Sequence, residues 1–97
     1  MYARVTRWEG ADGDKMRSAA EQIASQAATG PPEGVPGKGF LLLIDPDNGR
    51  SLAVGLFETE EDYRKGDETL NSMSPPDDGM GKRQSVEKYE VAVDERM

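Results

Sequence analysis

The sequence predicts one small α+β domain with the element order β-α-β-β-α-β, the ferredoxin-like sandwich with an antiparallel four-stranded sheet. Three observations lead to this prediction. Apolar strand-like runs alternate with amphipathic helix-like segments, an Asn-Gly turn joins the two middle strands, and the chain closes on another apolar strand. We expect strands at residues 1–9, 39–45, 50–58 and 85–93, and helices at residues 14–28 and 60–73. Residues 1–97 are therefore expected to form a single domain.

The first strand carries two different sets of side chains, because successive residues of a strand point to opposite faces. Ala3 and Val5 form a small apolar set. The other set is amphipathic and aromatic, and consists of Tyr2, Arg4, Thr6 and Trp8. This second set favours a face that is covered by something else, such as a partner sheet or a ligand.

Both predicted helices start at residues that can cap them. Asp12 or Asp14 can accept hydrogen bonds from the free N–H groups of the first helix. Thr59–Asp62 reads as a capping box for the second helix. The apolar face of the first helix is mostly alanine, so we expect that helix to lie close to the sheet.

The two middle strands are predicted to form a hairpin. Phe40–Ile44 is apolar at every position, which is typical of a central strand buried on both faces. Asn48 and Gly49 both tolerate positive φ and mark the turn after it. Residues 30–39 and 74–81 are rich in Pro and Gly and are expected to be loops.

Size and composition favour an oligomer. A chain of 97 residues buries only about 60–65% of the surface that its unfolded form exposes. Only 35% of the residues are apolar, so the core of a monomer would be lean. Association through a face of the sheet would add buried apolar surface, and we expect a homodimer.

The charge balance excludes several classes of partner. Nineteen acidic and twelve basic residues give a formal charge of −7, which opposes binding to nucleic acid or to anionic lipid. The chain has no Cys, hence neither a thiolate nucleophile nor a cysteine-based metal site. No apolar stretch reaches the length of a membrane span. We therefore expect a cytoplasmic protein that binds neither nucleic acid nor membranes.

Four segments, in this order, resemble a known family. They are Tyr2–Thr6, Gly39–Leu43, Phe57–Asp62 and Val86–Val91. Together they look like the antibiotic biosynthesis monooxygenase-like (ABM) domains of the dimeric α+β barrel superfamily. The resemblance implies a ferredoxin-like protomer whose sheet packs on that of a second copy to form a barrel. It also implies a pocket between the sheet and the helices of each protomer.

The resemblance leaves several kinds of function open. Some members are cofactor-free monooxygenases of polycyclic aromatic substrates, and others cleave haem. The haem-cleaving pattern has an Asn in the first strand, where Thr6 or its neighbour stands here. That pattern also has a Trp three residues after the aromatic residue that corresponds to Tyr63, and Gly66 stands there instead. The chain has no His to ligate iron, so we expect no cofactor and no haem cleavage.

The candidate ligand-binding residues are those able to wall a pocket or to supply polar groups to it: Arg4, Thr6, Trp8, Phe57 and Tyr63. Aromatic walls suit an apolar ligand, Arg4 suits a developing negative charge, and Thr6 can donate a hydrogen bond. The alternative is that the aromatic residues belong to the core or an interface. Arg4 would then form an inter-subunit or cross-strand ion pair.

An acidic cluster precedes and opens the second helix: Glu58, Glu60, Glu61 and Asp62. Carboxylates in the first turn of a helix complement its dipole, so we interpret the cluster as part of the helix start and expect no metal site.

Two functions fit these observations. The first is a small-molecule-binding dimeric barrel without a demonstrable catalytic motif, and the absence of His and Cys favours it. The alternative is a cofactor-independent monooxygenase acting on a small aromatic or quinone-like substrate. In the dimer we expect seven residues to be buried: Val5, Leu42, Ile44, Val54, Leu56, Tyr89 and Val91.

Overall fold

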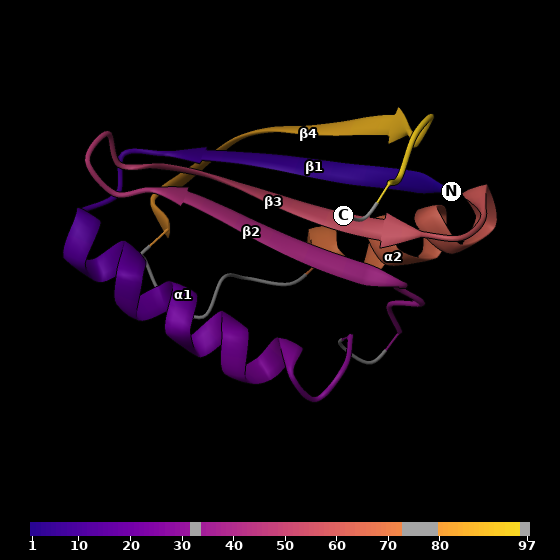
Figure 1. The fold of residues 1–97 in the computed structure, drawn as a ribbon, viewed down its shortest axis with the longest axis horizontal. Coiled ribbons are helices and arrows are strands. Elements are labelled where there is room, and N and C mark those ends of the chain that lie inside the picture. Colours follow the sequence, from indigo (N-terminus) through magenta and orange to yellow (C-terminus); the bar gives the residue numbers. More distant parts are fainter. Residues whose placement is uncertain (32–33, 73–79, 96–97) are drawn as a thin grey trace.

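The computed structural model describes residues 1–31, 34–72 and 80–95. The elements follow the predicted order and are shown in Figure 1: β1 (Tyr2–Glu9), α1 (Gly13–Ala27), β2 (Gly39–Asp45), β3 (Arg50–Phe57), α2 (Glu60–Ser72) and β4 (Lys82–Glu90). The α+β fold class and the four-stranded sheet are thereby confirmed. Most of the predicted loop at residues 74–81 and the last predicted residue of the second helix, Met73, lie outside the described residues.

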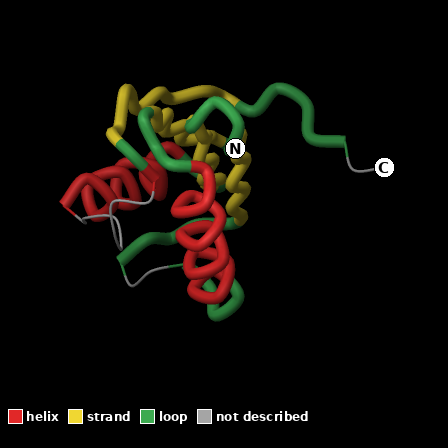
Figure 2. Tube along the Cα trace, turned by 90° about the vertical axis from the view of Figure 1, so that its left-hand side faces the viewer, coloured by secondary structure: helices red, strands yellow, loops and turns green. Residues whose placement is uncertain are grey.

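The strands form one antiparallel sheet in the order β2-β3-β1-β4, and both helices lie on the same side of it (Figures 1 and 2). Arg4 pairs with Gly55 and Thr6 with Ala53, so these residues share the side of the sheet that carries the helices, here called the covered face. Val5 pairs with Val54 on the opposite side, here called the open face. Residues 91–95, which follow β4, run away from the body of the molecule (Figure 2).

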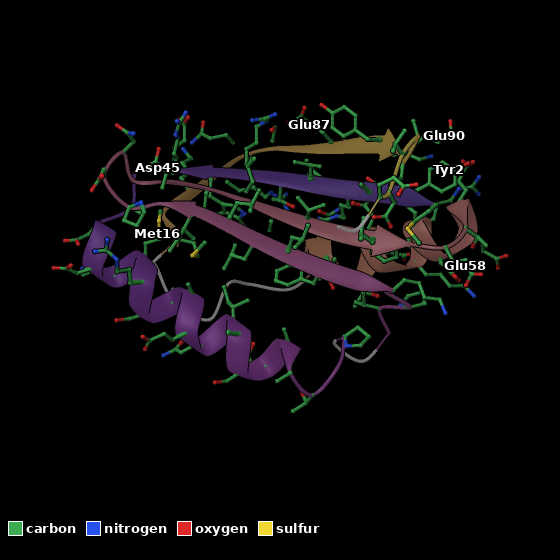
Figure 3. All side chains as sticks on the ribbon, in the orientation of Figure 1. Tyr2, Met16, Asp45, Glu58, Glu87 and Glu90 are labelled. Atoms are coloured by element: carbon green, nitrogen blue, oxygen red, sulfur yellow. The ribbon has the colours of Figure 1, made fainter. Side chains whose placement is uncertain are left out.

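Two small clusters make up the buried core on the covered face. Met16 and Ala19 of α1 pack with Met80 at one end of the sheet, and Figure 3 shows Met16 between α1 and the strands. Phe57 and Tyr63 pack with Val35 at the other end. The buried apolar core that the structure describes is therefore split into two clusters, and the buried side chains of Arg4 and Thr6 on the same face are polar.

The helix starts follow the predicted capping chemistry. Asp12 is the N-cap of α1, and its carboxylate accepts a hydrogen bond from the Asp14 N–H at 2.9 Å. Thr59 precedes α2, and its hydroxyl accepts a hydrogen bond from the Asp62 N–H at 3.1 Å. The hairpin turn also forms, but only Gly49 has a positive φ, of 65°, while Asn48 does not.

The prediction that Phe40–Ile44 forms a central strand buried on both faces is wrong. β2 is an edge strand, and Phe40, Leu41 and Leu43 are 47%, 47% and 53% exposed. A continuous apolar run indicates that both faces of a strand favour burial. It does not indicate which neighbouring elements bury them. One face of β2 borders a cavity, and on the other face Leu41 and Leu43 are not covered by any element that the structure describes.

The last strand starts and ends three residues before its predicted position. Lys82 and Arg83 pair with Glu9 and Trp8 through their backbones, although their side chains show no apolar alternation. Val91 follows the strand and donates its N–H to the Met1 carbonyl at 2.9 Å, while Val93 is 78% exposed. Backbone pairing decided this strand, and the apolar pattern was a poor guide to it.

Of the seven residues expected to be buried in the dimer, five are half-buried in the single chain: Val5, Leu42, Val54, Leu56 and Val91. Ile44 and Tyr89 are exposed. The single chain therefore does not bury these two residues, because Ile44 lies on an edge strand and Tyr89 lies on the open face.

The alanine face of α1 approaches the sheet only in its first half. Met16 and Ala19 are fully buried, whereas Ala24 and Ala27 are exposed. Close packing of α1 against the sheet is therefore found in the first half of the helix, and its second half leaves space over the sheet. Neither helix that the structure describes combines the length and the apolar character needed to cross a membrane.

Candidate ligand-binding cavity

A cavity of about 780 Å³ lies between the covered face, the second half of α1 and the connector that leads to β2. Its volume is within the range of about 300–1,000 Å³ that is usual for small-molecule sites. The floor is formed by the middle of β3, where Ala53 and Gly55 present little or no side chain. Small floor residues and the diverging α1 are together the reason that the space is not filled.

The walls of the cavity are mainly apolar. Trp8 and Phe40 contribute aromatic rings from the sheet, Ile23 comes from α1, and Leu70 comes from α2. Phe57 borders the cavity at its buried end and is only 1% exposed. Such walls favour a ligand with an apolar body, because they offer few hydrogen-bonding partners.

One region of the cavity is polar and is organised around Arg4. Its Nε donates to Asp67 Oδ1 at 2.7 Å, its Nη1 donates to Thr6 Oγ1 at 3.1 Å, and its Nη2 donates to Asn71 Oδ1 at 3.0 Å. Arg83 from β4 donates to the same Asn71 oxygen at 3.1 Å. Arg4 is 7% exposed, and a charge buried to this degree needs such partners. The cluster therefore holds a guanidinium group in a fixed place beside an apolar wall.

Four of the five candidate residues from the sequence border the cavity: Arg4, Thr6, Trp8 and Phe57. Tyr63 does not border it. Its ring packs edge-on against Phe57, with centroids 5.6 Å apart, and burial together with the charge of Asp67 raises the pKa of its hydroxyl. Tyr63 therefore lies behind the wall and supports Phe57. A ligand-binding role for the five candidate residues stays a prediction.

Sequence reasoning did not identify Arg83, Asn71 or Phe40 as members of this site. Arg83 precedes the predicted last strand at residues 85–93, Asn71 is an ordinary polar residue near a helix end, and the apolar run of Phe40–Ile44 predicts a buried strand. Arg4 forms its ion pair with Asp67 of α2, so the pair joins sheet to helix within one chain. The pairing of β4 with β1 and the position of α2 bring these residues together. No local sequence pattern predicts this proximity.

The residues of the cavity do not fit a ligated haem. The chain has no His or Cys, and neither Tyr nor Met occurs among the described lining residues. At Gly66, a Cβ atom would overlap the ring of Phe57, so that position has no room for the Trp of the haem-cleaving pattern. The first observation disagrees with iron ligation at this site, and the second disagrees with the haem-cleaving pattern.

The acidic cluster at the start of α2 is engaged in ion pairs. Glu60 pairs with Arg64 at 3.2 Å and with Lys88 at 3.3 Å, and these cations lower the pKa of its carboxyl. Glu61 pairs with Lys65 at 3.5 Å. Within residues 1–31, 34–72 and 80–95, no group of three or more acidic side chains is arranged to hold a metal.

A second polar cluster lies on the open face, around Glu87 of β4 (Figure 3). Its carboxylate accepts hydrogen bonds from Tyr89 Oη at 2.6 Å, from Arg7 Nε at 2.5 Å and from Ser85 Oγ at 3.0 Å. These hydrogen bonds lower the pKa of Glu87 to about 2, and the bond from Tyr89 has the largest effect. The cluster is remote from the cavity, because it lies on the opposite side of the sheet.

No protein-family model matches the chain, and no curated protein matches it either. Among solved structures, the chain is similar to an arginine-to-serine mutant of MhuD, crystallised with two manganese protoporphyrin IX molecules bound per active site. The TM-score is 0.65, the identity is 16%, and the alignment covers 100% of both chains. At this identity the likeness shows the fold alone, and it supports an ABM-like ferredoxin fold.

Proposed function

We propose that two copies of this chain pack through their open faces into a dimeric α+β barrel, and that each copy binds a small, largely apolar molecule in its cavity. The observation that carries the proposal is the cavity of about 780 Å³ with apolar walls and a fixed cluster of hydrogen-bond donors. Small-molecule sites commonly combine these features. MhuD, which has the same fold, holds porphyrins in its active site, and this supports a ligand-binding role for the fold.

The open face supports the dimer. Its centre is aliphatic and is formed by residues of three strands: Val5, Leu41, Leu43, Leu52, Val54 and Leu56. Leu41 and Leu43 are about half exposed in the single chain. Soluble monomers rarely leave a contiguous apolar patch of this kind in water, and two such sheets can pack face to face at about 10 Å.

Native mass spectrometry of the purified protein tests the assembly and also detects a retained ligand. We expect the mass of a dimer at micromolar concentration. A monomer under the same conditions would contradict the barrel.

Binding is tested by calorimetric titration with 2-naphthaleneethanol, a neutral apolar probe, while the indole N–H signal of Trp8 is followed by NMR. The chain has one Trp, so this signal reports on the cavity without ambiguity. We expect saturable binding that shifts the signal. Absence of binding would contradict the ligand-binding function.

The alternative function is a cofactor-independent monooxygenase acting on a small aromatic or quinone-like substrate. The observation that favours it is the position of Arg4 and Thr6 beside the apolar wall, where their donors would stabilise an oxyanion that develops on a substrate. Oxygen would be the oxidant. One of its atoms would enter a ring methylene as a carbonyl, and the other would leave as water with the two methylene hydrogens.

Oxygen consumption with anthrone as the substrate tests this alternative. If Arg4 stabilises the oxyanion, Arg4→Ala lowers turnover at least about tenfold. Circular dichroism shows whether the variant stays folded, and Asp67→Asn controls for the loss of the ion pair. Unchanged turnover in a folded Arg4→Ala protein would remove the catalytic role of Arg4.

A further inference from the structure

We propose that the ligand of the cavity carries a carboxylate, and that Arg83 and Arg4 together bind this group beside Asn71. The inference rests on the proposed ligand-binding function and names the class of ligand: an apolar, preferably aromatic, body with one carboxylate. Four observations lead to it.

The first observation is the sign of the charge around the cavity. The chain has 19 acidic and 12 basic residues, yet the charged side chains that line the cavity are Arg4, Lys38 and Arg83, all of them cations. No carboxylate lines it among the described residues. A cavity with this lining in a protein of net charge −7 attracts an anionic group.

The second observation is the pairing of these cations. Arg4 pairs with Asp67 at 2.7 Å, and Lys38 pairs with Glu58 at 3.3 Å. Arg83 donates to the neutral side chain of Asn71, and in the part of the chain that the structure describes no carboxylate pairs with it. Arg83 is therefore the cation whose charge an incoming carboxylate would balance.

The third observation is the proximity of the two guanidinium groups. Arg4 Nη2 and Arg83 Nη1 both donate to Asn71 Oδ1, at 3.0 and 3.1 Å, so they lie no more than about 6 Å apart. Two cations at this distance repel each other, and an anion bound to both would relieve the repulsion. Arginine suits the task, because its planar fork of N–H groups matches the two oxygens of a carboxylate.

The fourth observation is the number of donors that remain. Arg4 uses its Nε–H, one N–H of Nη1 and one of Nη2 in the hydrogen bonds described above. A guanidinium has five N–H groups, so two of them have no partner within the described residues. Trp8 and Phe40 line the same cavity and can contact the apolar body of a ligand whose carboxylate meets the arginines.

The experiment compares two probes that differ in charge but share an apolar body, 2-naphthaleneacetate and 2-naphthaleneethanol. Affinities are measured by calorimetry at low salt, with the Trp8 indole signal as the reporter of the cavity. We expect the carboxylate to bind about tenfold more tightly than the alcohol, the usual effect of a charge-assisted hydrogen bond. The preference should decrease as salt is added, because salt screens the attraction.

Arg83→Gln removes the unbalanced charge, and we expect it to bring the ratio of the two affinities close to one. Arg17→Gln is the matched control: it makes the same change of charge on an exposed part of α1, outside the lining of the cavity, and should keep the tenfold ratio. Because Arg83 is exposed, its replacement should leave the fold intact, which circular dichroism checks.

The outcomes separate the two proposals. Binding of both probes with equal affinity would overturn the carboxylate inference and leave the ligand-binding function standing. A preference that persists in Arg83→Gln would overturn the role of Arg83. Failure of both probes to shift the Trp8 signal would overturn the ligand-binding function and the inference with it.

Discussion

The two faces of the sheet differ in what covers them. On the covered face, helices bury Phe57 and Met16 completely but leave a cavity with a cationic cluster between them. On the open face, Leu41 and Leu43 are about half exposed, and the polar residues gather around Glu87 at the β4 edge. The covered face thus buries a core within the chain and borders a cavity, whereas the open face leaves aliphatic side chains partly exposed. Side chains of each strand alternate between the two faces, and the faces differ because the helices pack on only one of them.

The largest expected effect is a difference between the two faces in how much a truncated side chain lowers the free energy of unfolding. Phe57→Ala removes a fully buried ring and should lower the free energy of unfolding by about 3–5 kcal/mol, measured by urea denaturation. Leu43→Ala on the open face should cost less than about 1 kcal/mol in dilute solution, because the side chain is 53% exposed. Equal losses for the two variants would show that the faces do not differ in this way.

A smaller effect is expected at Gly66, where α2 packs on the covered face. Gly66→Ala places a Cβ against the Phe57 ring and should lower the free energy of unfolding by about 1–3 kcal/mol, although alanine favours helix. Phe57→Leu in the same chain should recover part of this loss, because the smaller side chain frees the space. A stabilised Gly66→Ala protein would contradict the close contact.

The open face is tested by a charge in its aliphatic centre. Leu43→Glu should weaken dimer formation at least about tenfold, because the dimer would bury an unpaired carboxylate. Sedimentation equilibrium measures the dissociation constant. Ala24→Glu introduces the same charge on the exposed surface of α1 and should leave the dimer intact. If both variants dimerise like the parent protein, the open face is not the interface.

The smallest expected effect is a pH dependence that belongs to the open face. Glu87 has a pKa of about 2 in the folded protein, below its ordinary value of 4.5, so the folded state binds fewer protons than the unfolded state between these values. Its contribution to stability is complete above about pH 5 and is lost as the pH falls through 4.5 towards 2. In thermal melts between pH 2 and pH 6, the melting temperature should depend less on pH for Glu87→Gln than for Glu68→Gln. The second variant is the control, because it changes an exposed carboxylate of α2. Identical profiles for the two variants would contradict the role of the cluster.

Trp8 is the residue for which the structure sharpens a sequence prediction. From the sequence, the set of side chains that includes Trp8 could be covered either by a partner sheet or by a ligand. The structure places Trp8 on the covered face, where it lines the cavity, so loss of ligand affinity is now the expected result of Trp8→Ala. Dimerisation should be retained, because the open face does not include this side chain.

The sequence by itself determined the elements and their order. Alternating apolar residues in β1, the N-caps Asp12 and Thr59, and Gly49 in the turn are local signals, and each acts on residues that are near neighbours in the chain. It also separated the aromatic and cationic set of β1 from the small apolar set. For that reason four candidate residues are found together at one cavity.

Only the tertiary structure decided how these elements combine. The order β2-β3-β1-β4 placed the most apolar strand at an edge, and the divergence of α1 opened the cavity above Gly55. The contacts of Arg4 with Asp67 and Asn71 span 63 and 67 residues of sequence, and no local pattern encodes such a pairing. Periodicity indicates which side chains favour burial, whereas long-range packing determines which elements bury them. The cavity lies where the helices leave part of the sheet unpacked.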